Sequence, residues 1–260
     1  MLLAFNIGNT SISFGAVSEE GLRFRADIAA HPVRTADEYA VLLAQIFTLH
    51  GFDPATITDV IIASVVPSLF NAVRAAVTRF TAVKPSIVGP GMRTGLQIRI
   101  DTPTQLGADL VVLAAGAKKH IRSGAAVIAC LETATTLTVM DADGAICGVV
   151  ILPGVASAAA ALERDTAQLP QILLTPPKKV IGKNTSDSIR SGLLWGAAVQ
   201  LDGLVERIAE ELDIPAAEIS LLATGQYADR VTSLCRHRFL RYPDLLFTGL
   251  RELHQLNRRN

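Results

Sequence analysis

The sequence predicts a mixed α/β protein with two domains, each built around its own β-sheet. Short β-rich runs alternate with stretches of helical spacing along the chain. The pattern of the opening strands returns in the second half. The 260 residues, half of them hydrophobic and 18% charged, are enough for one large domain or two of ordinary size. We expect a first domain over residues 1–120 and a second over residues 121–260.

The first domain is expected to open with three strands, the first two joined by a Gly8-Asn9-Thr10 turn. Alternating helices and a buried parallel strand then follow, and prolines near the first turns of two helices suit helix starts. The predicted elements are strands at 2–7, 11–17, 22–29 and 60–65, and helices at 35–50, 67–80 and 103–120.

The second domain is expected to repeat this layout. Aligning Asn6 with Cys130 places Gly8 on Glu132, an offset of 124 residues. The similarity lies in layout more than in residue identity. The predicted elements are strands at 126–130, 137–140, 146–152 and 219–223, a hairpin turn at Asp143-Gly144, a long amphipathic helix over 186–212, and a helix after Thr224-Gly225.

Composition and short motifs exclude several classes of protein. The net charge is zero, which argues against a general nucleic-acid binder, and the hydrophobic content argues against a disordered chain. No targeting signal is found, and no uncharged apolar run reaches the roughly 18–20 residues of a membrane span. The three cysteines form no CxxC pair and the five histidines are scattered, so we expect a cytoplasmic protein without a zinc site.

Two turns that follow strands are candidate phosphate-binding sites. Gly8, Asn9 and Thr10 could present backbone N–H groups and a hydroxyl to a phosphate. Thr133 and Thr135 offer hydroxyls after the corresponding strand of the second half. Structural alternatives stand beside both: an ordinary hairpin turn for the first, and a Thr-rich strand for the second.

Two further motifs could take part in chemistry. Asp109 follows Gly107 in a predicted helix, where its carboxylate could accept a proton from a substrate hydroxyl. The alternative is a solvent-facing acid that the helix dipole favours. The strand at 146–152 ends in Pro153-Gly154 before a helix, which fits either a functional loop or a structural turn.

Taken in their order and spacing, these motifs resemble the acetate kinase/sugar kinase/Hsp70/actin superfamily. More narrowly, the chain is similar to the type III pantothenate kinases over nearly its full length. Each matching segment is weak alone, but eight in the family's order are specific. They are LLAFNIGNTSISFGA, IIASVVPSL, VGPGMRTGLQIRIDTPTQLGAD, TATTLTV, DGAICGVVILPG, IGKNTSDSIRSGLLWG, LLATG and PDLLFTGLREL.

The resemblance implies two ribonuclease-H-like domains of the actin/sugar-kinase type and the ATP-dependent phosphorylation of pantothenate in coenzyme A biosynthesis. It implies that Asp109 accepts the proton of the pantothenate hydroxyl, with Gly107 and Thr185 on the substrate side and Gly225 on the nucleotide side. It also implies ATP, Mg²⁺ and a monovalent cation, K⁺ or NH₄⁺, as cofactors. Phosphoryl transfer depends mainly on positioning and charge neutralisation.

The resemblance further implies a homodimer. Gly192 and Gly196 lie four residues apart on the predicted long helix, where they would form a smooth face for close helix packing. The alternative is an internal helix contact within one chain.

The chain departs from the family pattern where charge matters most. Asn6 and Cys130 stand where the family has aspartates, and Thr138 stands where a further aspartate is usual. Glu132 replaces a glycine beside the phosphates, and Leu110 replaces an arginine that would suit the pantothenate carboxylate. Smaller departures are Val149 for a glycine and Gln226 for the last glycine of an adenine-side Thr-Gly-Gly.

These departures predict strongly reduced or lost kinase activity. Magnesium prefers carboxylate and water oxygens, and three anionic positions have become neutral. A like charge at 4 Å from a phosphate costs about 1 kcal/mol in water and about 4 kcal/mol at an effective dielectric constant of 20. Two alternatives remain: Glu132 replaces a metal ligand in an active enzyme, or the chain is a non-catalytic paralogue that senses a ligand or associates with a protein.

Overall fold

The computed structural model describes residues 1–122, 124–165 and 170–258. The chain divides into two compact units, and each is described by itself. The first unit comprises Met1–Gly95, Thr102–Gly116 and the segment that begins at Asp244; the second comprises Leu96–Asp101 and Ala117–Pro243. This division differs in three places from the single boundary expected between residues 120 and 121. Residues 96–101 and 117–120 group with the second unit, and the C-terminal helix groups with the first.

The first unit is a five-stranded sheet with the strand order β3-β2-β1-β4-β5. Strand β1 is antiparallel to β2 and parallel to β4, so it lies at the centre of the sheet. Helices α1 and α2 cover the face that carries Phe5 and Ile7, and together they form one hydrophobic core. The elements of this unit are β1 (Leu2–Ile7), β2 (Ser11–Val17), β3 (Leu22–Ala29), α1 (Ala36–Leu49), β4 (Asp59–Ser64), α2 (Pro67–Val77), β5 (Ser86–Ile87), α3 (Ala108–Ala117) and α7 (Leu245–Asn257).

Helix α7 lies on the opposite face of this sheet. Phe247 of α7 reaches Gly15 of β2, which shares the face of Asn6 because strand side chains alternate. Gly249 of α7 packs directly on the backbone of α3 at Val112, where a larger residue would collide with the main chain. This contact anchors the C-terminal helix in the first unit.

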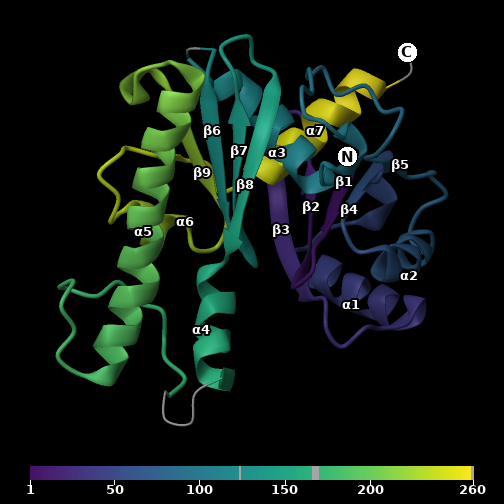
Figure 1. Ribbon diagram of the computed structural model, residues 1–260. Helices are drawn as coiled ribbons and strands as arrows, with labels where there is room; N and C mark the ends of the chain where they lie inside the picture. Colours follow the sequence, from purple (N-terminus) through teal and green to yellow (C-terminus); the bar gives the residue numbers. More distant parts are fainter. Residues whose placement is uncertain (123, 166–169, 259–260) are drawn as a thin grey trace. The chain divides into compact units, whose positions relative to one another are not determined.

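The second unit is a five-stranded sheet with the strand order β10-β9-β6-β7-β8. Helices α4 and α5 contribute Val155, Leu194 and Leu201 to a core on the face of Val127 and Ala129. Figure 1 shows the long helix α5 running beside this sheet. The elements are β6 (Ala126–Leu131), β7 (Ala134–Met140), β8 (Ile146–Pro153), α4 (Val155–Asp165), α5 (Thr185–Leu212), β9 (Ser220–Thr224), α6 (Ala228–Thr232) and β10 (Leu240–Arg241).

The two sheets share one topology, which confirms the predicted α/β fold of two similar halves. The offset of 124 residues carries the bounds of β1 onto those of β6. The hairpins differ at their tips. Ile7 pairs with Ile12 across the first turn, whereas Leu131 pairs with Thr135 across the second, so the second turn is one residue shorter.

Most predicted elements are confirmed, with two kinds of difference. The helix expected at 103–120 is divided into three parts. A short 3-10 turn at Pro103–Gln105 is separate from α3 because Leu106 adopts an extended conformation, and a second 3-10 turn at Lys118–His120 follows α3 directly. The two-residue strands β5 and β10 were not predicted. Across the described part of the chain, no helix combines the length and apolar character needed to cross a membrane.

Candidate functional site

The first candidate turn, at residues 8–10, is exposed at its tip and fixed by its main chain. The N–H of Gly8 donates to the carbonyl oxygen of Ser11 at 2.9 Å. A Cβ at Gly8 would lie 3.2 Å from the same oxygen, so the close turn favours glycine. Asn9 and Thr10 are exposed, and the carbonyl of Thr10 accepts a hydrogen bond from the N–H of Ala30 at 2.9 Å. The turn therefore offers polar groups on a rigid support.

Asn6 lies just before this turn with an unsatisfied amide oxygen. It pairs with Ser13 of β2 and Ala63 of β4, and among the described residues its buried Oδ1 has no hydrogen-bond partner. Its neighbour Ser13 donates a short hydrogen bond to Asp27 of β3. The side chain of Asn6 thus offers a neutral amide oxygen at a position where the family resemblance predicts a carboxylate.

The second candidate turn is held tightly from one side. The carbonyl of Thr133 accepts hydrogen bonds from the N–H of Gly154 at 3.2 Å and the hydroxyl of Ser157 at 2.7 Å. A Cβ at Gly154 would overlap the backbone of this turn, which explains the glycine of the Pro-Gly motif. Thr133 is exposed, whereas Thr135 is buried in β7 between Leu131 and Leu152. Of the two predicted threonines, only Thr133 lies at the surface of the turn.

The carboxylate of Glu132 is engaged within the second unit. Its Oε1 accepts a hydrogen bond at 2.8 Å from the backbone N–H of Gln226, which follows β9. Gly225 has a φ of +100°, and a Cβ there would lie 2.6 Å from the carbonyl oxygen of Leu131. The structure thus brings Glu132, Thr133 and Gly225 together around the end of β6. The sequence carries no local signal for the contact between Glu132 and Gln226, because the two residues are 94 positions apart.

The remaining predicted positions of this unit are neutral. Cys130 is half-buried and pairs with Thr136 and Thr224. The hydroxyls of Thr136 and Thr138 are buried without a hydrogen-bond partner in the described chain. No group of three or more His, Cys, Asp or Glu side chains that could hold a metal ion occurs within residues 1–122, 124–165 and 170–258.

These donors do not fit a divalent cation held by the protein. Asn6, Cys130 and Thr138 supply an amide, a thiol and a hydroxyl, whereas Mg²⁺ favours carboxylate oxygens and water. One oxygen of Glu132, the predicted replacement ligand, accepts the N–H of Gln226, and no second acidic group joins it in the described chain to form a cluster of three or more ligands.

Asp109 lies in the first turn of α3 in an environment suited to a proton acceptor. Burial raises the pKa of Asp109 above its ordinary value, and backbone N–H groups, including that of Leu110, partly oppose this rise. A Cβ at Gly107 would lie 2.5 Å from Oδ1 of Asp109, so glycine leaves room for the carboxylate. Leu110 is buried, with 8% of its surface exposed, in the core rather than at a polar surface.

Helix α5 carries the predicted substrate-side threonine and the two predicted interface glycines. Thr185 is exposed at the first position of the helix, and Asn184 caps it by accepting the N–H of Asp187 at 2.9 Å. A Cβ at Gly192 or Gly196 would meet no other atom of the described chain within 4 Å. The described chain thus offers no internal helix contact at these two glycines.

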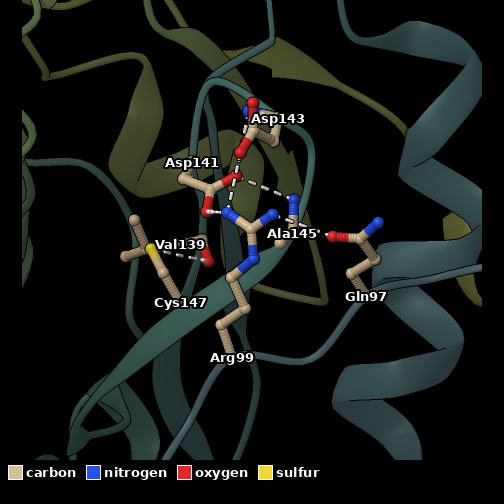
Figure 2. A network of polar contacts seen from close by, with 7 residues as sticks. All are labelled: Gln97, Arg99, Val139, Asp141, Asp143, Ala145 and Cys147. Atoms are coloured by element: carbon tan, nitrogen blue, oxygen red, sulfur yellow. Dashed lines mark hydrogen bonds and ion pairs between the residues drawn. The ribbon is translucent and has the colours of Figure 1, made fainter.

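A polar cluster around Arg99 was not predicted (Figure 2). The Arg99 guanidinium contacts Asp141 at 3.0 Å, Asp143 at 2.7 Å and Gln97 at 2.9 Å. Hydrogen bonding to Asp143 and the charge of Asp141 raise the pKa of Arg99. Asp141 also accepts the N–H of Ala145 at 2.9 Å and so closes the turn between β7 and β8. The cluster fixes residues 96–101 to the second unit.

Comparison with known proteins identifies the lineage. Residues 2–207 match the family described as type III pantothenate kinase. A type III pantothenate kinase from Anaeromyxobacter dehalogenans is 38% identical over 258 residues, which cover 99% of this chain and 100% of the relative.

Solved structures show the same fold at low identity. A Baf family protein from Campylobacter jejuni has a TM-score of 0.61 at 15% identity, covering 98% of both chains. A ROK family glucokinase from Streptomyces griseus, in complex with glucose and AMPPNP, has a TM-score of 0.51 at 13% identity and covers 98% of both chains. The fold is therefore that of the actin/sugar-kinase type. With its two similar sheets, its two hairpin turns and this sequence match, the chain belongs to the type III pantothenate kinase family.

Proposed function

We propose that this chain is a pantothenate kinase homologue whose phosphoryl transfer is strongly reduced or lost. Family membership implies ATP-dependent phosphorylation of pantothenate, a reaction that uses ATP and a divalent cation. The observation that supports the proposal is the donor set at the ends of β1 and β6. Asn6 and Cys130 are neutral, and the nearby carboxylate of Glu132 accepts a backbone N–H.

Any residual reaction would use Asp109 as the base. The hydroxyl oxygen of pantothenate would form a bond to the γ-phosphorus of ATP, the bond to the bridging oxygen would break, and ADP would leave. Asp109 would take the hydroxyl proton, and the raised pKa of its carboxyl strengthens it as a proton acceptor. A base contributes about 10²–10⁴-fold, whereas stabilisation of charge at the phosphoryl group is usually the largest contribution. The remaining base therefore cannot offset the missing anionic positions.

We further propose a cytoplasmic homodimer that packs through α5. Gly192 and Gly196 face open space along this helix, and exposed Val199 continues the same stripe. A monovalent cation, K⁺ or NH₄⁺, would be needed only in an active protein.

The second candidate is a non-catalytic paralogue that keeps the scaffold for ligand sensing or protein association. The observation that favours it is that the scaffold glycines are intact while the charged positions are not. Gly154 and Gly225 both retain the close backbone contacts that require glycine.

Turnover and ligand binding separate the two candidates. ADP release would be measured with pantothenate, ATP and magnesium, and ligand binding by thermal shift with ATP, pantothenate and coenzyme A thioesters. Weak pantothenate-dependent turnover that disappears in Asp109→Asn supports a residual kinase. Ligand binding without turnover supports the non-catalytic paralogue. Turnover at about 1 s⁻¹ or faster, within the usual range of enzymes, contradicts both.

A further inference from the structure

The carboxylate of Glu132 joins two turns of the second unit that are far apart in sequence. Its Oε1 accepts the N–H of Gln226 at 2.8 Å, and the neighbouring N–H of Tyr227 donates to the carbonyl of Leu131 at 3.1 Å. Two consecutive N–H groups after β9 are therefore held by Leu131, the last residue of β6, and by Glu132, the residue that follows it.

The first unit shows why the N–H of Gln226 is open to a side-chain acceptor. There, β4 continues its parallel ladder beyond its last residue, and the N–H of Val65 donates to the carbonyl of Ile7 at 3.0 Å. By strand register, Ile7 corresponds to Leu131 and Val65 corresponds to Gln226. In the second unit, however, the carbonyl of Leu131 accepts from the next residue, Tyr227.

The glycine turn accounts for this shift. Gly225, with a φ of +100°, bends the chain away from the regular ladder and releases the N–H of Gln226. The N–H of Gln226 is exposed, and a carboxylate is a stronger acceptor for it than water. Glu132 supplies that acceptor from the end of the neighbouring strand β6. The turn that carries Glu132 is itself fixed by Gly154 and Ser157, so it is a firm anchor.

We propose that Glu132 is a positioning residue that holds the Gly225-Gln226 peptide through its hydrogen-bond acceptor rather than its charge. This inference deepens the proposed function and rests on it where the nucleotide is concerned, because Gly225 is the expected nucleotide-side residue. It also changes the meaning of the departure from glycine at position 132. The acid adds negative charge to the turn, and at the same time it supports the neighbouring turn.

Two variants separate these effects. Glu132→Gln removes the charge but keeps an amide oxygen as acceptor, whereas Glu132→Gly removes both. We expect the backbone amide of Gln226 to exchange with solvent deuterium at least about 10-fold faster in Glu132→Gly, and within about 3-fold of the unmodified protein in Glu132→Gln. Glu163→Gln, an exposed acid on α4, is the matched control, and the amide of Val65 is the internal reference.

Unchanged exchange at Gln226 in Glu132→Gly overturns the proposal, as does equally fast exchange in both variants. If Glu132→Gly fails to fold, acceleration in Glu132→Gln beyond about 10-fold also overturns it. Calorimetry with magnesium-ATP adds a second measurement. We expect Glu132→Gln to bind ATP more tightly than Glu132→Gly. Equal affinity of the two neutral variants, both tighter than the unmodified protein, would show that Glu132 acts through its charge alone and would overturn the proposal. Absence of ATP binding in every variant would count against the proposed function, while the exchange result still decides the role of Glu132.

Discussion

The two sheets of this protein share one topology, but the parallel ladder beside each hairpin turn ends differently. In the first unit, the ladder between β1 and β4 runs on to Val65, and Gly8 needs no side chain to complete its turn. In the second unit, Gly225 breaks the ladder one residue early, and Glu132 satisfies the released N–H. The acid in the second hairpin turn is therefore more than a departure from the glycine of the family pattern. It is also part of the way in which the second sheet ends.

The same contrast applies to the two most informative carboxylates. Asp109 of the first unit is partly buried, and burial raises the pKa of its carboxyl, which is the arrangement of a proton acceptor. Glu132 of the second unit accepts a backbone N–H, which is a structural arrangement. The first unit thus retains Asp109, the carboxylate proposed as the base. In the second unit, the carboxylate of Glu132 supports the backbone at Gln226.

Restoring the anionic positions of both units should have the largest effect. Asn6→Asp and Cys130→Asp, combined with Glu132→Gln, should raise pantothenate phosphorylation at least about 1,000-fold, because groups that stabilise transferred charge act as a unit. Leu110→Arg is left out, since Leu110 is buried and a guanidinium there would lack a polar environment. The rate would be measured by ADP release.

Each unit restored alone provides the control for this comparison. Asn6→Asp by itself, and Cys130→Asp with Glu132→Gln, should each give much less than the combined variant. A combined variant no faster than the better single unit would show that the two turns do not act together in phosphoryl transfer.

The next-largest effect is expected from a substitution of Gly225, the glycine at which the regular ladder of the second unit ends. Gly225→Ala should lower the free energy of unfolding by about 3 kcal/mol, because a positive φ is strained for alanine and the new Cβ would press on Leu131. Gly144→Ala is the matched control. Gly144 also has a positive φ, +75°, but a Cβ there meets nothing within 4 Å, so we expect a loss of about 1 kcal/mol. Urea unfolding measures both, and equal losses would mean that the close approach to Leu131 carries no cost.

Two helix glycines, one in each unit, also differ in what surrounds them. Gly249 of α7 packs on the backbone of α3, whereas Gly196 of α5 faces open space. If that open face is the dimer interface, Gly196→Leu should weaken dimerisation at least about 10-fold, equivalent to about 1.4 kcal/mol. Glu211→Leu is the control, because Glu211 is exposed on the same helix but lies about four turns beyond Gly196. Analytical ultracentrifugation would test this, and a monomer at high micromolar concentration in the unmodified protein would contradict the proposal.

The comparison also shows what the sequence could reveal. Apolar strands with polar turns predicted β1 and β6 well, because their alternation and composition are local properties. The placement of α7 in the first unit was not predictable in this way, because it depends on the close contact of Gly249 with Val112, far away in the chain. The roles proposed for Asn6, Cys130 and Asp109 could be predicted from residue type and family resemblance. The contact of Glu132 with Gln226 could not, since Gln226 lies 94 residues beyond the acid and its N–H is released by the turn at Gly225.

The smallest effect tests whether Asp109 is kept for chemistry rather than for stability. Burial raises the pKa of the folded-state carboxyl above its unfolded value, so the ionised form destabilises the fold at neutral pH. Asp109→Asn should therefore raise the free energy of unfolding by about 0.5–1 kcal/mol at pH 7–8. The gain should fade as the pH falls through the folded-state pKa, because protonation then relieves the same cost in the unmodified protein. In the variant with both units restored, the same substitution should abolish phosphorylation. A substitution that destabilises the protein at pH 7–8, or that leaves the restored activity intact, would show that Asp109 serves the fold instead.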